Sequence, residues 1–394
     1  MLTFSRLEEA SVSRPDLRSS LPCGPATSWR RQCGTALMLT VLASCSDSGT
    51  SLEPVDGLLD QLECSIPERE FADGGVGIGG IPSLENPEFV PHFDPAAAYL
   101  DNTTGFSDPR VVGIVVEGEA FAIPHNILWW HEIVNLDFPS GLQIAVTYCP
   151  LTGSALVFDR STIGGAELGV SGLLIRNNLV MIDRDTNRSL WPQMMREARC
   201  GSRDGTELPM YASTSMTWSG WQELHPSTTV IGENTNAPRD YTRYPYGSYK
   251  ENQDLLFPQS DIDDRRPMKE WVLGIPAVTG DGGIAFPFLS LQQVEPGPVT
   301  VVHSPSPRGD VVVFWDQRAE GAMAFIPEVE GSPLTFRADD DRIVDEETGS
   351  VWRLDGVATA GPHAGTGMAP VAEAFPAFWF AWAAFHPDTE VWEP

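Results

Sequence analysis

One short stretch of the chain holds most of the side chains that are suited to chemistry. His131, Glu132 and Asn135 stand close together, and Cys149 follows them after a run rich in β-branched residues. A histidine beside a cysteine lowers the pKa of the thiol and makes it a nucleophile, and a third polar group can orient the imidazole ring. The pattern therefore fits a catalytic pair of Cys149 and His131, with Asn135 or Glu132 orienting the ring.

The same residue types also suit a metal ion. Imidazole, carboxylate and thiolate groups are ligands of copper and zinc, so His131, Glu132 and Cys149 form an alternative ligand set, with His125 as a fourth member. Their spacing is not that of a regular metal motif. A buried cysteine and a histidine bonded to the main chain are the structural alternative for the same pattern.

Polar residues near this stretch are candidates for binding a substrate. Tyr148, Thr152 and Ser154 lie in the same run as the cysteine, and Arg176 and Asn177 follow further along the chain. A guanidinium group and an amide suit the carboxylate of a small molecule. The alternative is that Arg176 and Asn177 fill a turn, and the sequence favours neither.

The elements that position these residues belong to a chain that repeats itself. Several motifs recur about 161 residues further on. Trp218-x2-Trp221-x3-His225-Pro226 recurs as Trp379-x2-Trp382-x3-His386-Pro387, Ser189-Leu190-Trp191 as Ser350-Val351-Trp352, and Val157-Phe158-Asp159 as Phe314-Trp315-Asp316. We therefore predict two pseudo-symmetric halves, residues 85–250 (the first half) and 251–394 (the second half). The polar stretch has no counterpart in the second half, which predicts a working first half and a supporting second half.

Short runs of β-branched and aromatic residues, separated by Gly, Pro and Asp, predict antiparallel strands. They cover Val111–Val116, Gln143–Tyr148, Ala155–Phe158, Leu179–Asp183, Trp271–Ile275, Thr300–His303 and Val311–Trp315. Each half closes with a predicted short helix, which Pro226 or Pro387 ends. The expected fold class is therefore mainly β with a few short helices (α+β), internally duplicated.

The two tryptophans and the histidine of each closing helix fall on one helical face. Such a face suits a platform for binding a planar ring. A motif present in both halves is better explained by packing, since tryptophan fills protein cores readily. His225 and His386 remain second-rank candidates for a site.

The longest of these motifs resemble a family known as domain of unknown function 3179. The resemblance covers almost all of the chain after the N-terminal segment, and it rests on the runs Trp130–Asn135, Thr147–Ser154, Ser171–Leu174, Ser189–Trp191 and Phe378–Trp382. It implies that many relatives have a second cysteine where this chain has Thr152. A dithiol or two-thiolate metal mechanism is therefore not expected here, and the resemblance implies no particular activity.

The N-terminus has the layout of an export signal. Arg30 and Arg31 precede the apolar run 36–43, and the small residues before Cys45 resemble the cleavage motif of a bacterial lipoprotein. Residues 1–44 are predicted to be a signal segment, with a start that is over-extended, and Cys45 to carry the lipid. Residues 45–84 are predicted to be a flexible tether. We therefore expect an extracytoplasmic protein, anchored to a bacterial membrane by this lipid alone.

Export places the remaining cysteines in an oxidising compartment. Cys64, Cys149 and Cys200 allow three pairings, each of which leaves one thiol free. We favour a Cys64–Cys200 disulfide, because Cys149 belongs to the polar stretch.

The charge of the chain limits its partners. It has 394 residues, with 25 basic and 54 acidic side chains and a net charge of −29, which does not suit binding to nucleic acid. The acidic loops 261–264 and 339–341 lack the spacing of calcium loops and are interpreted as solvated charge. The expected partner is a small molecule or an envelope protein. The sequence thus predicts an exported protein with a metal or thiol site at His131 and Cys149, and the alternative is a non-enzymatic binding or scaffold module.

Overall fold

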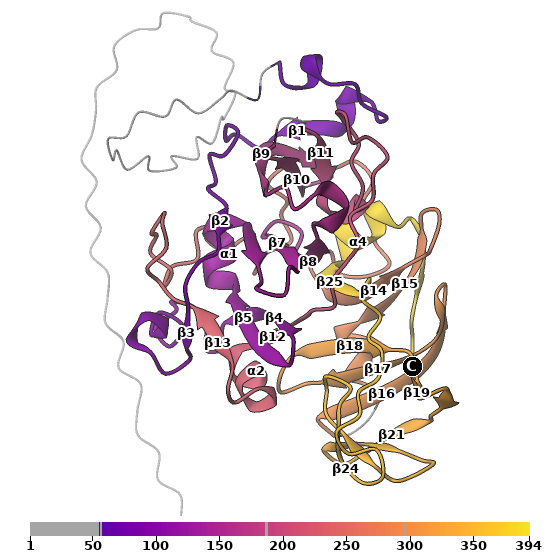
Figure 1. Ribbon diagram of the computed structural model, residues 1–394. Helices are drawn as coiled ribbons and strands as arrows, with labels where there is room; N and C mark the ends of the chain where they lie inside the picture. Colours follow the sequence, from indigo (N-terminus) through magenta and orange to yellow (C-terminus); the bar gives the residue numbers. More distant parts are fainter. Residues whose placement is uncertain (1–54, 56, 186–187, 295–296) are drawn as a thin grey trace, which may run out of the picture. The chain divides into compact units, whose positions relative to one another are not determined.

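The computed structural model describes residue 55 and residues 57–394, apart from 186–187 and 295–296 (Figure 1). The predicted signal segment 1–44 and the lipidation site Cys45 lie outside these described residues. The prediction of a mainly β fold with short helices is confirmed. The helices are α1 (His125–His131), α2 (Trp218–Leu224), α3 (Phe288–Leu291) and α4 (Trp379–Phe385). No helix in the described part of the chain is long and apolar enough to cross a membrane.

The described residues of the first half form three sheets, together with β1 and β2 from the segment that precedes it. The first has the order β12 (Thr214–Thr217), β4 (Arg110–Val116), β5 (Glu119–Pro124), β13 (Thr229–Ile231) and β3 (Phe89–Pro91). The second has the order β2 (Leu84–Glu85), β6 (Ile133–Asp137), β7 (Gln143–Cys149) and β8 (Ser154–Asp159). The third has the order β1 (Phe71–Asp73), β9 (Leu168–Ile175), β10 (Asn178–Asp183) and β11 (Leu190–Pro192).

The second half has three larger sheets and one small hairpin. The first sheet has the order β25 (Phe375–Phe378), β14 (Trp271–Pro276), β15 (Gly282–Pro287) and β26 (Asp388–Val391). The second comprises β16 (Val299–Ser306), β17 (Gly309–Asp316) and β18 (Gly321–Phe325). The third comprises β21 (Phe336–Asp339), β22 (Arg342–Asp345), β23 (Val351–Trp352) and β24 (Ala358–Ala360), and the hairpin pairs β19 (Glu328–Val329) with β20 (Ser332–Pro333).

Matching contacts recur in the two halves. The Trp221 indole packs on Gly113, where an added Cβ would lie 2.3 Å from the ring. The Trp382 indole packs on Gly274 in the same way, and a Cβ added there would lie 2.2 Å from the ring. Each indole N–H donates to a threonine seven residues later in the chain. The closing tryptophans are therefore core residues, as the packing interpretation expects. The duplication itself stays a prediction, and these contacts agree with it.

One of the sequence matches between the halves differs from the contacts. Phe158 on β8 forms an isolated bridge with Met210, and Phe325 on β18 forms the same kind of bridge with Pro370. The match of 157–159 with 314–316 would instead pair β8 with β17. By their contacts β8 is equivalent to β18, because each is the third strand of an antiparallel meander, β6–β7–β8 or β16–β17–β18. The sequence match was misleading because β8 and β17 both end in an aromatic residue followed by Asp.

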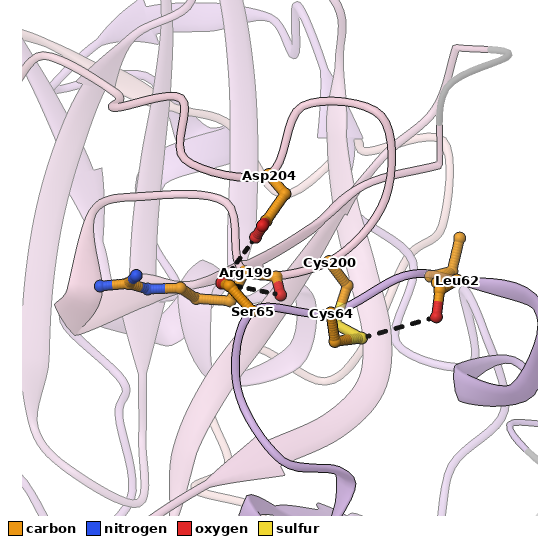
Figure 2. The surroundings of a disulfide bond; sticks show 6 residues. All are labelled: Leu62, Cys64, Ser65, Arg199, Cys200 and Asp204. Atoms are coloured by element: carbon orange, nitrogen blue, oxygen red, sulfur yellow. Dashed lines mark hydrogen bonds between the residues drawn. A yellow bond between two sulfur atoms is a disulfide. The ribbon is translucent and has the colours of Figure 1, made fainter.

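The segment predicted to be a flexible tether is ordered over much of its length. From residue 57 on it enters the fold: β1 pairs with β9, and β2 pairs with β6. Cys64 and Cys200 form a disulfide, the pairing favoured from the sequence, with the amide of Ser65 donating to the Arg199 carbonyl at 2.9 Å (Figure 2). Strand pairing and a cross-link that closes a long loop hold this polar segment in place, which its composition alone did not indicate.

The two halves share their cores. The β7–β8 turn of the first half accepts a hydrogen bond from the second half, from the amide of Phe378 to the Thr152 carbonyl at 2.8 Å. The β17–β18 turn of the second half accepts the reciprocal bond, from the amide of Thr217 to the Ala319 carbonyl at 2.8 Å. Each closing helix is therefore positioned on a turn of the other half.

Candidate functional site

Cys149 lies at the end of β7 with 1% of its surface exposed. Its thiol donates to the main-chain oxygen of Asn177 at 3.5 Å. Burial raises the pKa of the Cys149 thiol to about 11, and the nearby Glu132 carboxyl acts in the same direction. The sulfur is therefore a neutral thiol at pH 7, whereas nucleophilic attack and metal binding require the thiolate.

Glu132 is held in an unusual main-chain conformation directly after α1. Its φ of 57° and ψ of −30° cost a non-glycine residue about 1–3 kcal/mol. Its carboxyl is 8% exposed and accepts a hydrogen bond from the Tyr246 hydroxyl at 3.5 Å. Burial raises the pKa of Glu132 to about 8, so the acid is mostly protonated at neutral pH.

His131, the last residue of α1, is fully engaged away from Cys149. Its Nδ1 donates to the Pro82 carbonyl at 2.7 Å, and its Nε2 lies 2.7 Å from the hydroxyl of Tyr241. The carbonyl can only accept, so the ring is a donor at Nδ1 and an acceptor at Nε2. Burial lowers the pKa of His131 to about 4, which keeps the ring neutral. The structure therefore does not form the predicted thiol–imidazole pair.

His125 and Tyr148 form a packing contact. Their ring centres lie 4.1 Å apart, and the Nε2 of His125 lies 3.3 Å from the Ser215 hydroxyl. Burial lowers the pKa of His125 and raises that of Tyr148. The predicted fourth metal ligand and one predicted substrate residue are thus both closed inside the core.

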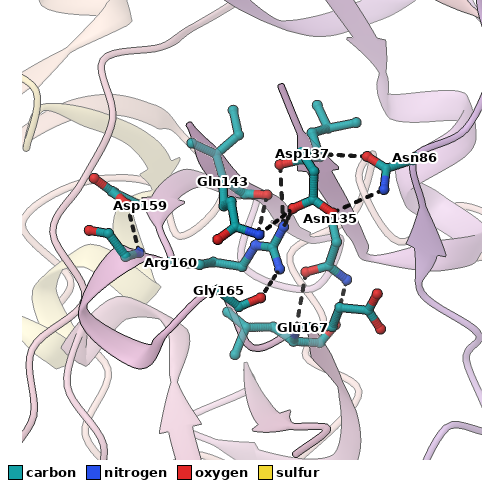
Figure 3. A network of polar contacts seen from close by, with 12 residues as sticks. Asn86, Asn135, Asp137, Gln143, Asp159, Arg160, Gly165 and Glu167 are labelled. Carbon is teal, nitrogen blue, oxygen red and sulfur yellow. Dashed lines mark hydrogen bonds and ion pairs between the residues drawn. The ribbon is translucent and has the colours of Figure 1, made fainter. Parts of the chain in front are cut away.

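Asn135, predicted to orient the imidazole, instead joins two sheets. Its side-chain amide donates to the Leu168 carbonyl at 2.9 Å and accepts from the Leu168 amide at 3.0 Å (Figure 3). The neighbouring Arg160 guanidinium is fully buried and pairs with Asp137 at 2.6 Å. The Asn135 side chain therefore makes its hydrogen bonds to the protein main chain, and it holds β6 against the start of β9.

Thr152 and Ser154 belong to a closed hydrogen-bond network below the β7–β8 turn. Their hydroxyls lie 2.9 Å apart, and the Ser154 hydroxyl donates to Gln193 at 2.7 Å. The amide of Asn178 donates to Thr152 at 3.0 Å and to Gln193 at 2.8 Å, while Gln193 donates to Thr147 at 2.8 Å. All five side chains are buried. Their polar atoms stabilise the turn and are not presented to a substrate.

Arg176 and Asn177 contact the second half. The Arg176 guanidinium donates to the Ala384 carbonyl and lies over the Phe385 ring. The Asn177 amide exchanges two hydrogen bonds with the main chain of Phe257, each at 3.2 Å. Both residues have positive φ, so they do fill a turn, and their side chains attach that turn to the second half.

The predicted ligands do not form a metal centre in this arrangement. Glu132 and Cys149 are close enough to act on one another electrostatically, but the nitrogens of His131 are bonded elsewhere. Within residues 57–394 as described, no group of three or more His, Cys, Asp or Glu side chains is placed to hold a metal ion. Copper or zinc would therefore need His131 to leave Pro82 and Tyr241.

A cavity of about 260 Å³ lies elsewhere, where α2 meets the β17–β18 turn and the sheet of β22 and β23. Apolar side chains from both halves form its walls: Leu224, Val299, Ala319, Ile343, Trp352 and Leu354. Polar and charged residues also line it: Ser219, Glu223, Asp316, Arg318, Asp341 and Arg353. Apolar walls with a few polar groups are typical of small-molecule sites, and this volume is slightly below the usual range of about 300–1,000 Å³.

Comparison with known proteins supplies a family but no activity. A family model described as "Protein of unknown function (DUF3179)" matches residues 78–389. The chain belongs to the DUF3179 family. No curated protein and no solved structure matches it.

The cavity of this DUF3179 protein involves residues that the sequence analysis did not select. Glu223 was passed over beside the tryptophan face, and Asp341 was interpreted as solvated charge. The cavity is lined by residues from five separate segments between 219 and 354. No local spacing connects them, so only the reciprocal packing of the two halves could have indicated the site.

Proposed function

We propose that this DUF3179 protein is an extracytoplasmic binding protein that takes a small molecule into the cavity beside α2. The observation that carries the proposal is the cavity itself, which is lined by apolar and charged residues from both halves. The polar residues around Cys149 are less suited to binding a ligand, because their hydrogen bonds are already made within the protein.

Ligand-observed NMR on the purified chain tests this proposal. Small aromatic compounds that are cationic, neutral or anionic are screened against the wild type and against Leu224→Trp. Leu224 is half-buried at the end of α2, so the larger indole fills the cavity while helix propensity changes little. We expect at least one class of compound to bind the wild type and to lose binding in Leu224→Trp. Absence of binding by all three classes would contradict the proposal.

The proposed location rests on the N-terminal pattern. Arg30, Arg31, the apolar run 36–43 and Cys45 support export and lipid attachment at a bacterial membrane. Metabolic labelling with a radioactive fatty acid tests it. We expect label in the wild type and none in Cys45→Ser, which should leave the membrane fraction.

A metal or thiol site around Cys149 is the second candidate, and one observation favours it. The strained main chain of Glu132 brings a buried carboxyl toward a buried thiol, and such strain is concentrated at functional sites. This candidate requires a rearrangement that frees His131. The Cys149 variant described in the Discussion separates it from the binding proposal.

A further inference from the structure

The charges around the cavity are unequally satisfied. The Arg318 guanidinium pairs with Asp316 two residues earlier, at 2.8 Å, and its main-chain amide donates to the same carboxylate. The Arg353 guanidinium likewise pairs with Asp355, two residues later. Both cations that line the cavity are therefore neutralised by near neighbours in the sequence.

Two carboxylates at the same cavity have no such partner. Glu223 on α2 and Asp341 before β22 are exposed, and neither makes an ion pair or side-chain hydrogen bond within the described residues. The pKa of Arg318 is raised, first by its hydrogen bonds to Asp316, and Glu223 and Asp341 act on it in the same direction. Both carboxylates line the cavity, whose lining holds three carboxylates and two guanidinium groups and so carries a net negative charge.

The wall of the cavity adds an aromatic surface. Trp352 is 3% exposed, is held by a hydrogen bond from its indole to Asp345 at 2.9 Å, and lines the cavity beside Ile343 and Leu354. An indole attracts a cation as well as apolar groups. A volume of about 260 Å³ suits a small ligand with one ring and a short arm.

We infer that the cavity binds a small organic cation, an ammonium group on an apolar body, with Glu223 and Asp341 facing the charge and the Trp352 wall facing the body. This inference rests on the proposed function and names its ligand class. A neutral or anionic molecule of the same shape would leave both carboxylates without a partner, and an anion would be repelled by them.

Three probes of similar shape test the inference by isothermal titration calorimetry: 2-phenylethylammonium, 2-phenylethanol and phenylacetate. We expect the ammonium compound to bind about ten-fold more tightly than the alcohol, and phenylacetate to bind most weakly, because each exposed carboxylate contributes modestly. The preference should shrink in high salt, which screens exposed charges.

Variants of the two carboxylates complete the experiment. In Glu223→Gln/Asp341→Asn the ammonium compound should bind no more tightly than the alcohol, while Glu328→Gln, an exposed carboxylate outside the cavity, should match the wild type. Equal affinity for all three probes, or an unchanged preference in the double variant, would overturn the cation assignment and leave the binding function standing. No binding of any probe or screened compound would overturn both.

Discussion

The β7–β8 turn and the β17–β18 turn occupy matching places, and their surroundings differ. Each turn receives a main-chain hydrogen bond from the residue before a closing helix, at Thr152 in one case and at Ala319 in the other. Around the first turn, buried polar side chains and the segment at Phe257 fill the space. Around the second, the side chains leave a cavity.

This difference changes the meaning of residues found in only one half. The polar side chains of Thr152, Ser154 and Asn177 are not repeated in the second half, and from the sequence this difference predicted a working site in the first half. Their hydrogen bonds show that they close the packing around the first turn. The second turn lacks these groups, and it is there that space for a ligand remains.

The largest predicted effect tests whether the two halves are built alike. In Gly113→Ala and Gly274→Ala the new methyl group would meet a tryptophan ring at 2.3 and 2.2 Å, so each should lower the free energy of unfolding by about 3 kcal/mol. Urea unfolding followed by fluorescence measures this. Gly282→Ala is the control, since its Cβ would have no neighbour closer than 3.8 Å. A large effect at one tryptophan and none at the other would argue against equivalent halves.

The next prediction compares the two turns directly. Gln193→Ala removes the partner of buried Thr147, Ser154 and Asn178, so it should cost about 2–3 kcal/mol of stability. Arg318→Ala at the second turn removes an ion pair whose arginine is 52% exposed, which should cost about 0.5 kcal/mol. Thermal and urea unfolding measure both. Equal costs would mean that the second turn is held as firmly as the first.

Much of the fold could be predicted because its signals are local. The strand predicted at Val111–Val116 is β4, and the helix that Pro226 ends is α2. The helix α1 was missed, since it is only seven residues long, is buried on almost all sides and begins after Pro124 without a side-chain cap. Its residues were interpreted only for their chemistry.

The candidate site could not be predicted to the same degree, because its partners are distant in the chain. Of the residues predicted to form the site, Glu132 acts on the pKa of the Cys149 thiol. The hydroxyl that is hydrogen-bonded to His131 belongs to Tyr241, 110 residues away, and Asn177 is hydrogen-bonded to Phe257, 80 residues away. Hydrogen bonds of this separation leave no pattern in a single sequence.

The third prediction uses the pKa of Glu132. A carboxyl whose pKa rises from 4.5 to about 8 on folding binds a proton more tightly in the folded state. Its contribution to stability is therefore lost as the pH rises through this window, by about 1.4 kcal/mol for each pH unit. His131 has the opposite effect below pH 6.5, because its pKa falls to about 4 on folding. As the pH rises from 6.5 to 8, the free energy of unfolding of Glu132→Gln should therefore increase by about 2 kcal/mol relative to that of the wild type.

Urea unfolding at pH 6.5, 7.2 and 8.0 measures this gain. Glu328→Gln is the control, because it makes the same substitution at an exposed position outside the polar stretch. If the free energies of unfolding of the wild type and Glu132→Gln changed in parallel with pH, the Glu132 carboxyl would be ionised in the folded protein. That result would support a charged partner for Glu132 and would strengthen the second candidate function.

The last prediction concerns Cys149. Cys149→Ala removes one buried sulfur with a weak hydrogen bond at 3.5 Å, so it should cost about 1 kcal/mol. Because burial raises its pKa to about 11, the wild-type thiol should react with a thiol reagent only after unfolding. Copper and zinc, measured by mass spectrometry on protein purified from the periplasm, should be equal in the wild type, Cys149→Ala and His131→Gln. Stoichiometric metal in the wild type that both variants lose would instead establish the centre at Cys149, and the closed turn would then be the working one.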